Sequence, residues 1–423
     1  MQSKKQFCNL ISRTISRLAT AALAIATVFA PTVVLTQSAQ AQTYNVIHTF
    51  TGGGDGGNPE AGLTMDQAGN LYGTASVGGG SGNGTAFKLS KKGSGWVFTP
   101  LYSFQGPPDG ATPEARVIFG PGGSLYGTTY FGGGGVGTVF SLKPYPTACK
   151  TALCGWQGTV LYSFTGGNDG RNPALGDLIF DQAGNLYGTT SDGGAYGYGT
   201  AFELVPSQGG WTEKILYSFT GGNDGSQPFA GLIFDNAGNL YGTTVYGGTY
   251  GWGTVYELTP SGSHWKVNVL YAFQGENDGG YPFGGLIFDQ SGNLYGDTWS
   301  AGQDNGGTVF ELAPSNGSWT YSVIYNFDGS GMYGSAASLV MDGAGNLYGT
   351  TLNDGHGPYG SGNVFKLTPS GGGWTYTSLY DFTGGSDGAE PISNVIFDAN
   401  GNLYGTTYYG GVNNNGVVWE ITP

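Results

Sequence analysis

The chain has 423 residues and is acidic, with 14 lysines and arginines against 28 aspartates and glutamates and a net charge of −14. Phosphate binding needs clustered cations, so this balance argues against a nucleic acid partner and against an anionic membrane surface. The 83 glycines follow no strict triplet spacing, which excludes a collagen-like chain.

The first 41 residues have the features of a secretory signal peptide. Four basic residues precede an apolar stretch from Leu18 to Leu35, and Ala39-Gln40-Ala41 follows as a small-residue cleavage site. An uncleaved membrane anchor is the alternative, because the stretch approaches spanning length. Cleavage after Ala41 leaves 10 basic and 28 acidic residues, a net charge of −18. We therefore predict a secreted, monomeric chain, extracellular or periplasmic, with no membrane span after cleavage.

Beyond the leader, a β-rich run at 44–50 is followed by a unit built around the pentapeptide NLYGT or a near copy. Its tyrosine recurs 53 to 61 residues apart, at Tyr72, Tyr126, Tyr187, Tyr241, Tyr295, Tyr348 and Tyr404. A period near 54 residues is longer than the coil of most solenoids and close to that of kelch-type propeller repeats.

Each unit contains four runs rich in β-branched and aromatic residues, and in the clearest copy they are 231–235, 239–244, 253–258 and 265–273. Short turns of the type D-x-x-G-N and T-P-S-G suit antiparallel hairpins, and no segment keeps a helical period. Seven such units predict an all-β, seven-bladed β-propeller of four-stranded blades, a single domain over 42–423. An all-β solenoid is the alternative.

The two ends of the chain indicate how the ring closes. The run at 44–50 matches the fourth run of a unit, and the last unit stops after its third run, at 416–421. We expect the N-terminal strand to complete the seventh blade, which leaves no unpaired blade edge.

The repeat resembles the choice-of-anchor tandem-repeat family called GloVer, whose copies carry GNLYGTT, GTVFELTP and LYSFTGGNDG. These strings stand here at 184–190, at 253–260 (with Tyr256 for phenylalanine) and at 161–170, and the resemblance covers essentially all of the chain after the leader. It implies an exported protein. Some members carry a C-terminal surface anchor, and because no such tail precedes Pro423 we expect a secreted, unanchored chain. The family has no established activity to carry over to any residue.

Two features bear on covalent and metal chemistry. Cys149 and Cys154 lie in a segment that the other units lack, and in an oxidising compartment they predict a local disulfide; no further metal ligands accompany them. An aspartate recurs in the loop between units, and we expect it to cap its own turn, with calcium binding as the alternative. These aspartates are Asp55, Asp109, Asp169, Asp224, Asp278 and Asp387. No other cofactor and no metal site is predicted.

Residues repeated in every blade serve the scaffold, so a functional site is expected where the units differ. The loop between the second and third runs varies most and carries aromatic residues interleaved with Asn, Asp and Gly. The candidates are Tyr130, Phe131, Tyr196, Tyr198, Tyr246, Tyr250, Trp252, Trp299, Asp354, His356, Tyr359, Tyr408 and Tyr409. Flat rings beside hydrogen-bonding side chains suit sugar or peptide recognition. The alternative is that these rings pack on one another.

A second departure from the repeat concerns the start of each innermost run, which should border the central channel. The residues there are Gly62, Arg116, Asp177, Gly231, Gly285, Ser338 and Asn394. Arg116 and Asp177, in neighbouring blades, are expected to form an ion pair, and Asp297 replaces the first threonine of YGTT on an inner strand.

The sequence favours binding over catalysis. No HExxH or G-x-S-x-G motif and no clustered metal-ligand spacing occurs. We predict a secreted, non-catalytic propeller that binds an extracellular glycan or protein through the aromatic loops. The alternatives are a glycan-active hydrolase or lyase that uses carboxylates of the same face, and a structural or adhesive surface protein.

Overall fold

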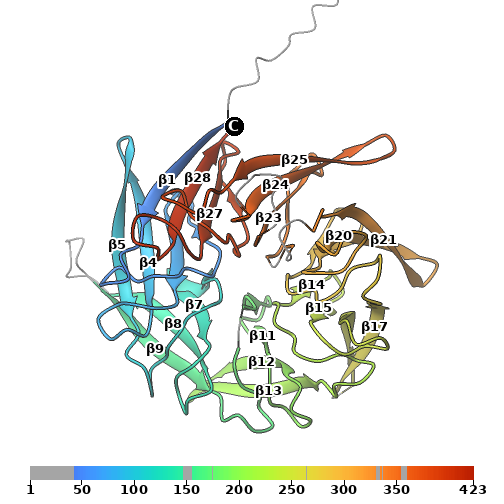
Figure 1. Ribbon diagram of the computed structural model, residues 1–423. Helices are drawn as coiled ribbons and strands as arrows, with labels where there is room; N and C mark the ends of the chain where they lie inside the picture. The colour runs from blue at the N-terminus through green and yellow to red at the C-terminus, as the bar shows by residue number, and fades with distance from the viewer. Residues whose placement is uncertain are drawn as a thin grey trace, which may run out of the picture. The chain divides into compact units, whose positions relative to one another are not determined.

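The computed structural model describes residues 42–145, 155–173, 175–262, 264–329, 334–335, 337–353 and 360–423. Within these residues, seven four-stranded antiparallel sheets are arranged in a ring (Figure 1), so the predicted seven-bladed β-propeller is confirmed. A single 3-10 turn, η1 (Pro121–Gly123), interrupts the strands, and the described part of the chain offers no helix long and apolar enough to cross a bilayer. The proposed leader, Cys149 and Cys154 lie outside the described residues.

Strands are called A to D from the channel outward. In blades 1 to 4 they are β2 (Thr64–Met65), β3 (Leu71–Ala75), β4 (Thr85–Lys92) and β5 (Gly95–Ser103); β6 (Ile118–Phe119), β7 (Leu125–Thr129), β8 (Thr138–Pro144) and β9 (Trp156–Ser163); β10 (Ile179–Phe180), β11 (Leu186–Thr190), β12 (Thr200–Ser207) and β13 (Gly210–Ser218); and β14 (Ile233–Phe234), β15 (Leu240–Thr244), β16 (Thr254–Ser261) and β17 (His264–Ala272).

Blades 5 to 7 follow the same order. Their strands are β18 (Ile287–Phe288), β19 (Leu294–Asp297), β20 (Thr308–Ser315) and β21 (Ser318–Asn326); β22 (Val340–Met341), β23 (Leu347–Thr351), β24 (Asn363–Ser370) and β25 (Gly373–Asp381); and β26 (Ile396–Phe397), β27 (Leu403–Thr407), β28 (Val417–Thr422) and β1 (Thr43–Thr49).

The innermost strands are shorter than the runs expected from the sequence. In blade 4 only Ile233 and Phe234 pair with strand B, opposite Tyr241 and Leu240. The residues ahead of them leave the sheet and line the channel wall, and the carbonyl groups there accept hydrogen bonds from neighbouring blades.

Blade 7 is closed by the N-terminal strand, as expected. Strand β1 pairs antiparallel with β28, with Tyr44 opposite Ile421 and Val46 opposite Trp419. The Tyr44 ring also stacks on Tyr380 of blade 6, with 3.8 Å between ring centroids. The first strand of the propeller therefore joins both its own blade and the blade before it.

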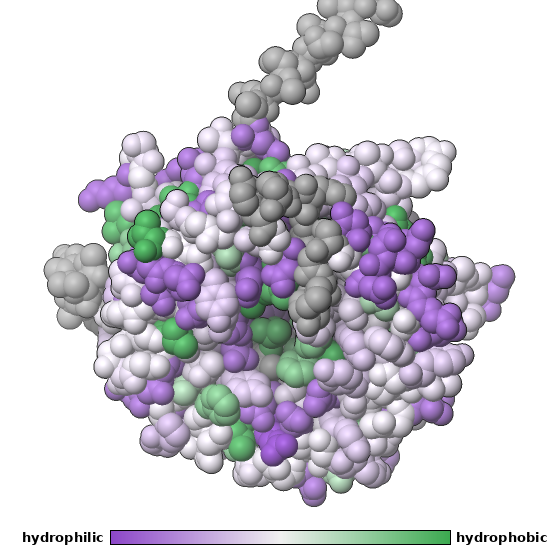
Figure 2. Space-filling model, in the orientation of Figure 1, coloured by the Kyte–Doolittle hydropathy of each residue, from purple (hydrophilic) through white to green (hydrophobic). Residues whose placement is uncertain are grey.

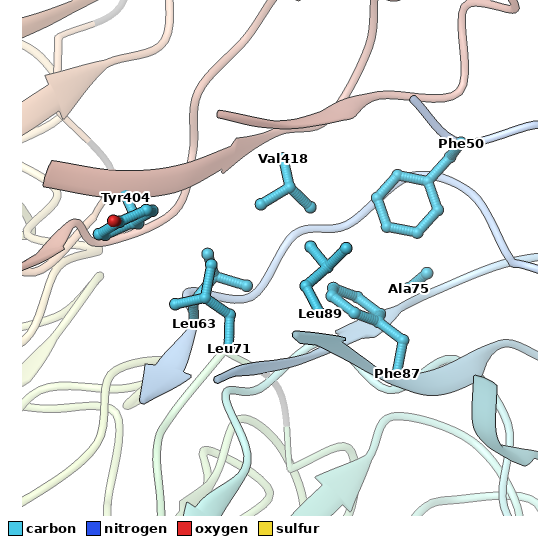
Figure 3. Packing of buried hydrophobic residues seen from close by; sticks show 8 residues of the cluster. All are labelled: Phe50, Leu63, Leu71, Ala75, Phe87, Leu89, Tyr404 and Val418. Carbon is cyan, nitrogen blue, oxygen red and sulfur yellow. The ribbon is translucent and has the colours of Figure 1, made fainter. Parts of the chain in front are cut away.

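The core lies between the blades. One cluster combines Phe50, Tyr404 and Val418 of blade 7 with Leu63, Leu71, Ala75, Phe87 and Leu89 of blade 1, all nearly inaccessible to solvent. Figure 3 shows the side chains of the two sheets facing each other across this junction. The expectation that the NLYGT tyrosines belong to the scaffold is met, since six of the seven are buried in such junctions.

The glycine after each NLYGT tyrosine is required by packing within the blade. A methyl group at Gly73 would lie 2.6 Å from Cζ of Phe87, and one at Gly296 would lie 2.5 Å from Cζ of Phe310. Because the phenylalanine of strand C lies directly over this glycine, a larger residue would displace it.

Both recurring aspartates cap turns. Asp235 accepts hydrogen bonds from the backbone N–H groups of Ala237 and Asn239, at 2.8 and 2.9 Å. In the loop between blades, Asp224 accepts hydrogen bonds from the backbone N–H of Thr220 at 2.8 Å and from the Tyr217 hydroxyl at 2.9 Å. The turn-capping interpretation is therefore confirmed for these two positions.

Among the described residues, a threonine links the blade to the next in five of the seven blades. The hydroxyl of the first threonine in YGTT donates to a backbone carbonyl of the following blade, as from Thr189 to Ala230 at 2.9 Å and from Thr243 to Gly284 at 3.2 Å. In blade 5 this residue is Asp297, which is fully buried. Ser335 donates to its Oδ2 at 2.7 Å, while Oδ1 has no partner among the described residues. Burial raises the pKa of Asp297 to about 7, although the Ser335 hydrogen bond acts in the opposite direction.

Replacing Asp297 with threonine should restore the inter-blade hydrogen bond and remove a half-paired buried carboxylate. We expect the free energy of unfolding at pH 8 to rise by about 1–3 kcal/mol. The native state retains this proton up to about pH 7, whereas the unfolded chain loses it near pH 4. The Asp297 contribution to stability therefore falls as pH rises through that window, and urea unfolding at pH 5 and pH 8 should show a smaller pH dependence in the variant.

The reverse change, Thr243→Asp in blade 4, is the matched control and should introduce the same pH dependence. An Asp297→Thr protein with an unchanged urea midpoint at pH 8 would contradict this account.

Candidate functional site

One face of the ring carries both the D–A loops, which connect successive blades, and the B–C loops, which lie within each blade. Isolated backbone bridges join the two kinds of loop, for example between Gly57 and Val77, between Ala111 and Phe131, and between Ser226 and Tyr246. We call this side the loop face. The sequence had placed the variable aromatic residues on it.

In the D–A loops that contain a proline, a tight turn directs the chain into the channel. The residue before the loop proline has a left-handed conformation, as at Asn58 (φ 53°), Thr112 (φ 56°) and Gln227 (φ 56°). Proline fixes its own φ and disfavours the right-handed helical region for the residue before it. The residue after the proline is thereby placed at the channel wall, as Glu60 and Glu114 are in blades 1 and 2.

A cavity of about 220 Å³ occupies the centre of the ring. All seven residues that the sequence placed at the starts of the innermost runs line it: Gly62, Arg116, Asp177, Gly231, Gly285, Ser338 and Asn394. Figure 2 shows a hollow at this place, with hydrophobic side chains inside it.

Two glutamates in neighbouring blades form the acidic wall of this cavity. Burial raises the pKa of Glu60 to about 7, with hydrogen bonds from the Ser76 and Tyr408 hydroxyls acting in the opposite direction. Burial and the nearby charge of Glu60 raise the pKa of Glu114 to about 8. Near neutral pH the two carboxyl groups therefore retain protons that exposed glutamates would lose.

The ion pair expected between Arg116 and Asp177 is present at the cavity wall. Arg116 Nη2 lies 2.7 Å from Asp177 Oδ2, its Nε donates to the same oxygen at 2.8 Å, and its backbone N–H donates to Oδ1 at 3.1 Å. Asp177 thus holds both the guanidinium and the main chain of the preceding blade.

Apolar side chains line the cavity at the equivalent positions of other blades. At the position of Glu60, blades 4, 5 and 7 carry Phe229, Phe283 and Ile392, of which Phe283 and Ile392 line the cavity. The Phe229 and Phe283 rings lie 5.5 Å apart, and Trp299 meets Phe283 edge to face at 4.9 Å. The cavity is therefore acidic on the side of blades 1 and 2 and aromatic on the side of blades 4 and 5.

The B–C loops carry aromatic rings on the loop face, and we call these rings the rim. Tyr196 and Tyr250 are the most exposed, at 61% and 56%, and Phe131, Tyr198, Tyr246 and Tyr409 are also exposed. Others are partly engaged: Trp252 packs on Tyr281 at 4.6 Å, Tyr130 lies against Phe131, and Tyr408 lies against Tyr409. The packing interpretation is therefore met for these pairs, and a role of the exposed rings in ligand recognition stays a prediction.

Some of the expected site residues lie elsewhere. Asp297 does not line the channel; it is buried, with Ser335 of blade 6 as its partner, because its strand turns this side chain toward the next blade. Asp354, His356 and Tyr359 lie outside the described residues.

Glu60 and Glu114 were missed by the sequence analysis. Both follow the loop proline, in NPEAG and TPEAR, where other units carry alanine, phenylalanine or isoleucine. The same comparison between units, made two residues before each innermost run, would have found them.

A family model matches the chain over 27–233, 146–357 and 320–423. The chain belongs to the Gloeobacter/Verrucomicrobia repeat family. No curated protein matches it.

Solved structures share the fold at low identity. A proposed 6-phosphogluconolactonase from Bacteroides uniformis is 15% identical with a TM-score of 0.51, and the match covers 81% of this chain and 88% of that one. PorZ, a surface component of the type-IX secretion system of Porphyromonas gingivalis, is 14% identical with a TM-score of 0.51 over 85% of this chain, which spans 46% of PorZ. These likenesses show the fold alone.

The coupling between the two glutamates can be measured directly. In Glu60→Gln the pKa of Glu114 should fall toward its ordinary value, because a neighbouring negative charge is removed while burial remains. Carbon-detected NMR titration of the labelled carboxyl groups would report the shift. Glu390→Gln, a change of equal charge in a D–A loop outside the cavity lining, should leave Glu114 unchanged. An unaltered Glu114 pKa in Glu60→Gln would show that burial alone sets it.

Proposed function

We propose that this protein is an exported, non-catalytic propeller that binds a carbohydrate on its loop face. The observation that carries the proposal is the rim, where tyrosine and phenylalanine rings project from the loops of several blades. Free rings exposed together on one face are unusual for a protein without a partner.

The chemistry beside the rings favours sugars among the possible ligands. A sugar ring presents C–H groups to an aromatic face and hydroxyl groups at its edge. Polar side chains lie near aromatic rings of the rim: Asp192 and Arg171, 4.0 Å apart, lie near Tyr130, and Asp304 and Asn305 line a shallow groove with Trp252. Alternating rings and hydrogen-bonding groups would suit several sugar units in a row.

A protein ligand is the nearest alternative to a glycan. An exported protein could meet either kind of ligand outside the cell. The small central cavity at the middle of the rim favours the glycan, because it would admit a single sugar-sized group and no folded partner. Location outside the cell and removal of the leader are parts of this proposal, supported by the basic and apolar pattern of residues 1–41.

Removing exposed aromatic rings of the rim should weaken glycan binding. In Tyr196→Ala and Tyr250→Ala, dissociation constants for glycans identified on an array should rise at least tenfold, which is about 1.4 kcal/mol per ring. Tyr250→Phe should retain most of the affinity, because the stacking face remains. Tyr145→Ala is the matched control, since this tyrosine is 58% exposed and lies at the end of β8, outside the B–C loops.

Isothermal titration of each variant with the glycan measures the affinity, and thermal melting checks that the variant is folded. Capture of a protein ligand with no glycan bound would replace the carbohydrate proposal. If glycan binding is unchanged in both alanine variants, the rim is not the binding site.

A glycoside hydrolase is a second candidate, favoured by one observation: two carboxyl groups of raised pKa share the cavity wall. Glycoside hydrolysis normally uses a protonated and an ionised carboxyl group on either side of the scissile bond. If the protein hydrolyses its glycan, Glu60→Gln and Glu114→Gln should each lower the rate at least 100-fold, as measured by release of reducing ends. Binding without any product would reject this candidate and support the non-catalytic one.

A further inference from the structure

The central cavity has a chemical polarity that the ring scaffold does not require. The position after the loop proline is glutamate in blades 1 and 2 but phenylalanine in blades 4 and 5 and isoleucine in blade 7. The scaffold therefore tolerates an apolar residue at this position. Two partly buried carboxyl groups, in contrast, lower the stability of the fold when they ionise. Side by side, the two carboxyl groups would suit a ligand that carries positive charge and stabilises their ionised forms.

Within the described part of the chain, the cavity wall offers no second cation to compensate the pair. Among the described residues that line the cavity, Arg116 is the single cation, and its guanidinium is held by Asp177 at 2.7 Å. The groups that face the glutamates are instead the hydroxyls of Ser76 and Tyr408 at Glu60, and the phenol of Tyr130, which is near enough to feel the charge of Glu114. These donors can stabilise one negative charge but they bring no positive one.

The other wall suits a compact carbon skeleton. Phe283 lines it, and the Phe229 and Trp299 rings pack on Phe283, while Ile392 of blade 7 adds an apolar side chain to the cavity beside blade 1. The volume of about 220 Å³ lies below the roughly 300–1,000 Å³ of pockets for drug-sized ligands. A single six-membered ring with one charged substituent matches this size and polarity.

We propose that the central cavity binds the protonated amino group of an amino sugar between Glu60 and Glu114, with the sugar ring against Phe283. An ammonium group donates three hydrogen bonds and carries the positive charge that the cavity lacks. It attracts both carboxylates in a partly desolvated site, where charge pairs are stronger than in water. A neutral sugar could accept and donate hydrogen bonds here but would leave the carboxyl groups protonated, whereas an ammonium group would stabilise their ionised forms. This inference rests on the proposed glycan-binding function and specifies which sugar the centre of the rim selects.

The test compares three oligosaccharide series of equal length by isothermal titration at pH 7: glucosamine, N-acetylglucosamine and glucose oligomers. We expect the glucosamine series to bind at least tenfold more tightly than the other two. In Glu60→Gln and in Glu114→Gln this preference should disappear, while the affinity for neutral oligomers should change less than threefold. Both substitutions relieve mutual repulsion, so thermal melting should show folded proteins.

Non-specific attraction of a cationic glycan to an acidic protein is controlled by Glu390→Gln. This variant loses the same single charge from a D–A loop whose glutamate does not line the cavity, and it should keep the full preference. A preference that survives Glu60→Gln and Glu114→Gln, or that falls equally in Glu390→Gln, overturns the inference.

The remaining outcomes distinguish this inference from the proposed function. Equal affinity for all three series shows that the cavity does not select an amine, while glycan binding by the rim stands. Absence of binding to any glycan, here and on the array, overturns both.

Discussion

The structure depends on hydrophobic packing between blades. Each sheet has apolar faces that it cannot bury alone, and the clusters that bury them contain residues of two neighbouring blades, as Phe50 and Val418 of blade 7 do with Leu63 and Phe87 of blade 1. A blade therefore buries apolar surface against both of its neighbours. The ring closes because the first strand and the last three strands form one sheet, which supplies the seventh blade with both neighbours.

This constraint explains which residues repeat. The junctions contain the NLYGT tyrosine, the glycine after it and the phenylalanine of strand C. These positions are closely packed, so a change of side-chain volume destabilises the fold. The threonine that follows the glycine links one blade to the carbonyl of the next. Asp297 departs from this pattern without reaching the channel, so a departure from the repeat is not by itself evidence of a site.

The same constraint leaves other positions free to vary. The residue after the loop proline faces the channel instead of a neighbouring sheet, so glutamate, phenylalanine and isoleucine all fit there. The B–C loops are tied to the D–A loops by backbone bridges, which hold their conformation while their side chains differ. Variation at fixed backbone positions allows a symmetric ring to have an acidic and an aromatic side.

Much of this could be derived from the sequence because the repeat reports the same local structure seven times. The number of blades, the strand order, the closing strand and the ion pair between Arg116 and Asp177 all follow from counting equivalent positions. The shortness of the innermost strands does not, because GLIFD has the composition of a five-residue strand. Only the convergence of seven blades at the axis takes its first residues out of the sheet.

The candidate site divides in the same way. The sequence by itself determined the ring, its closure and the face on which variable aromatic residues gather, because these depend on periodicity and on loop positions along each unit. The tertiary structure alone decided that Glu60 and Glu114 share a cavity wall opposite Phe283, and that Asp297 lies buried between blades. Both depend on the direction of side chains and on distances between residues of different blades, and no pattern within one unit specifies them.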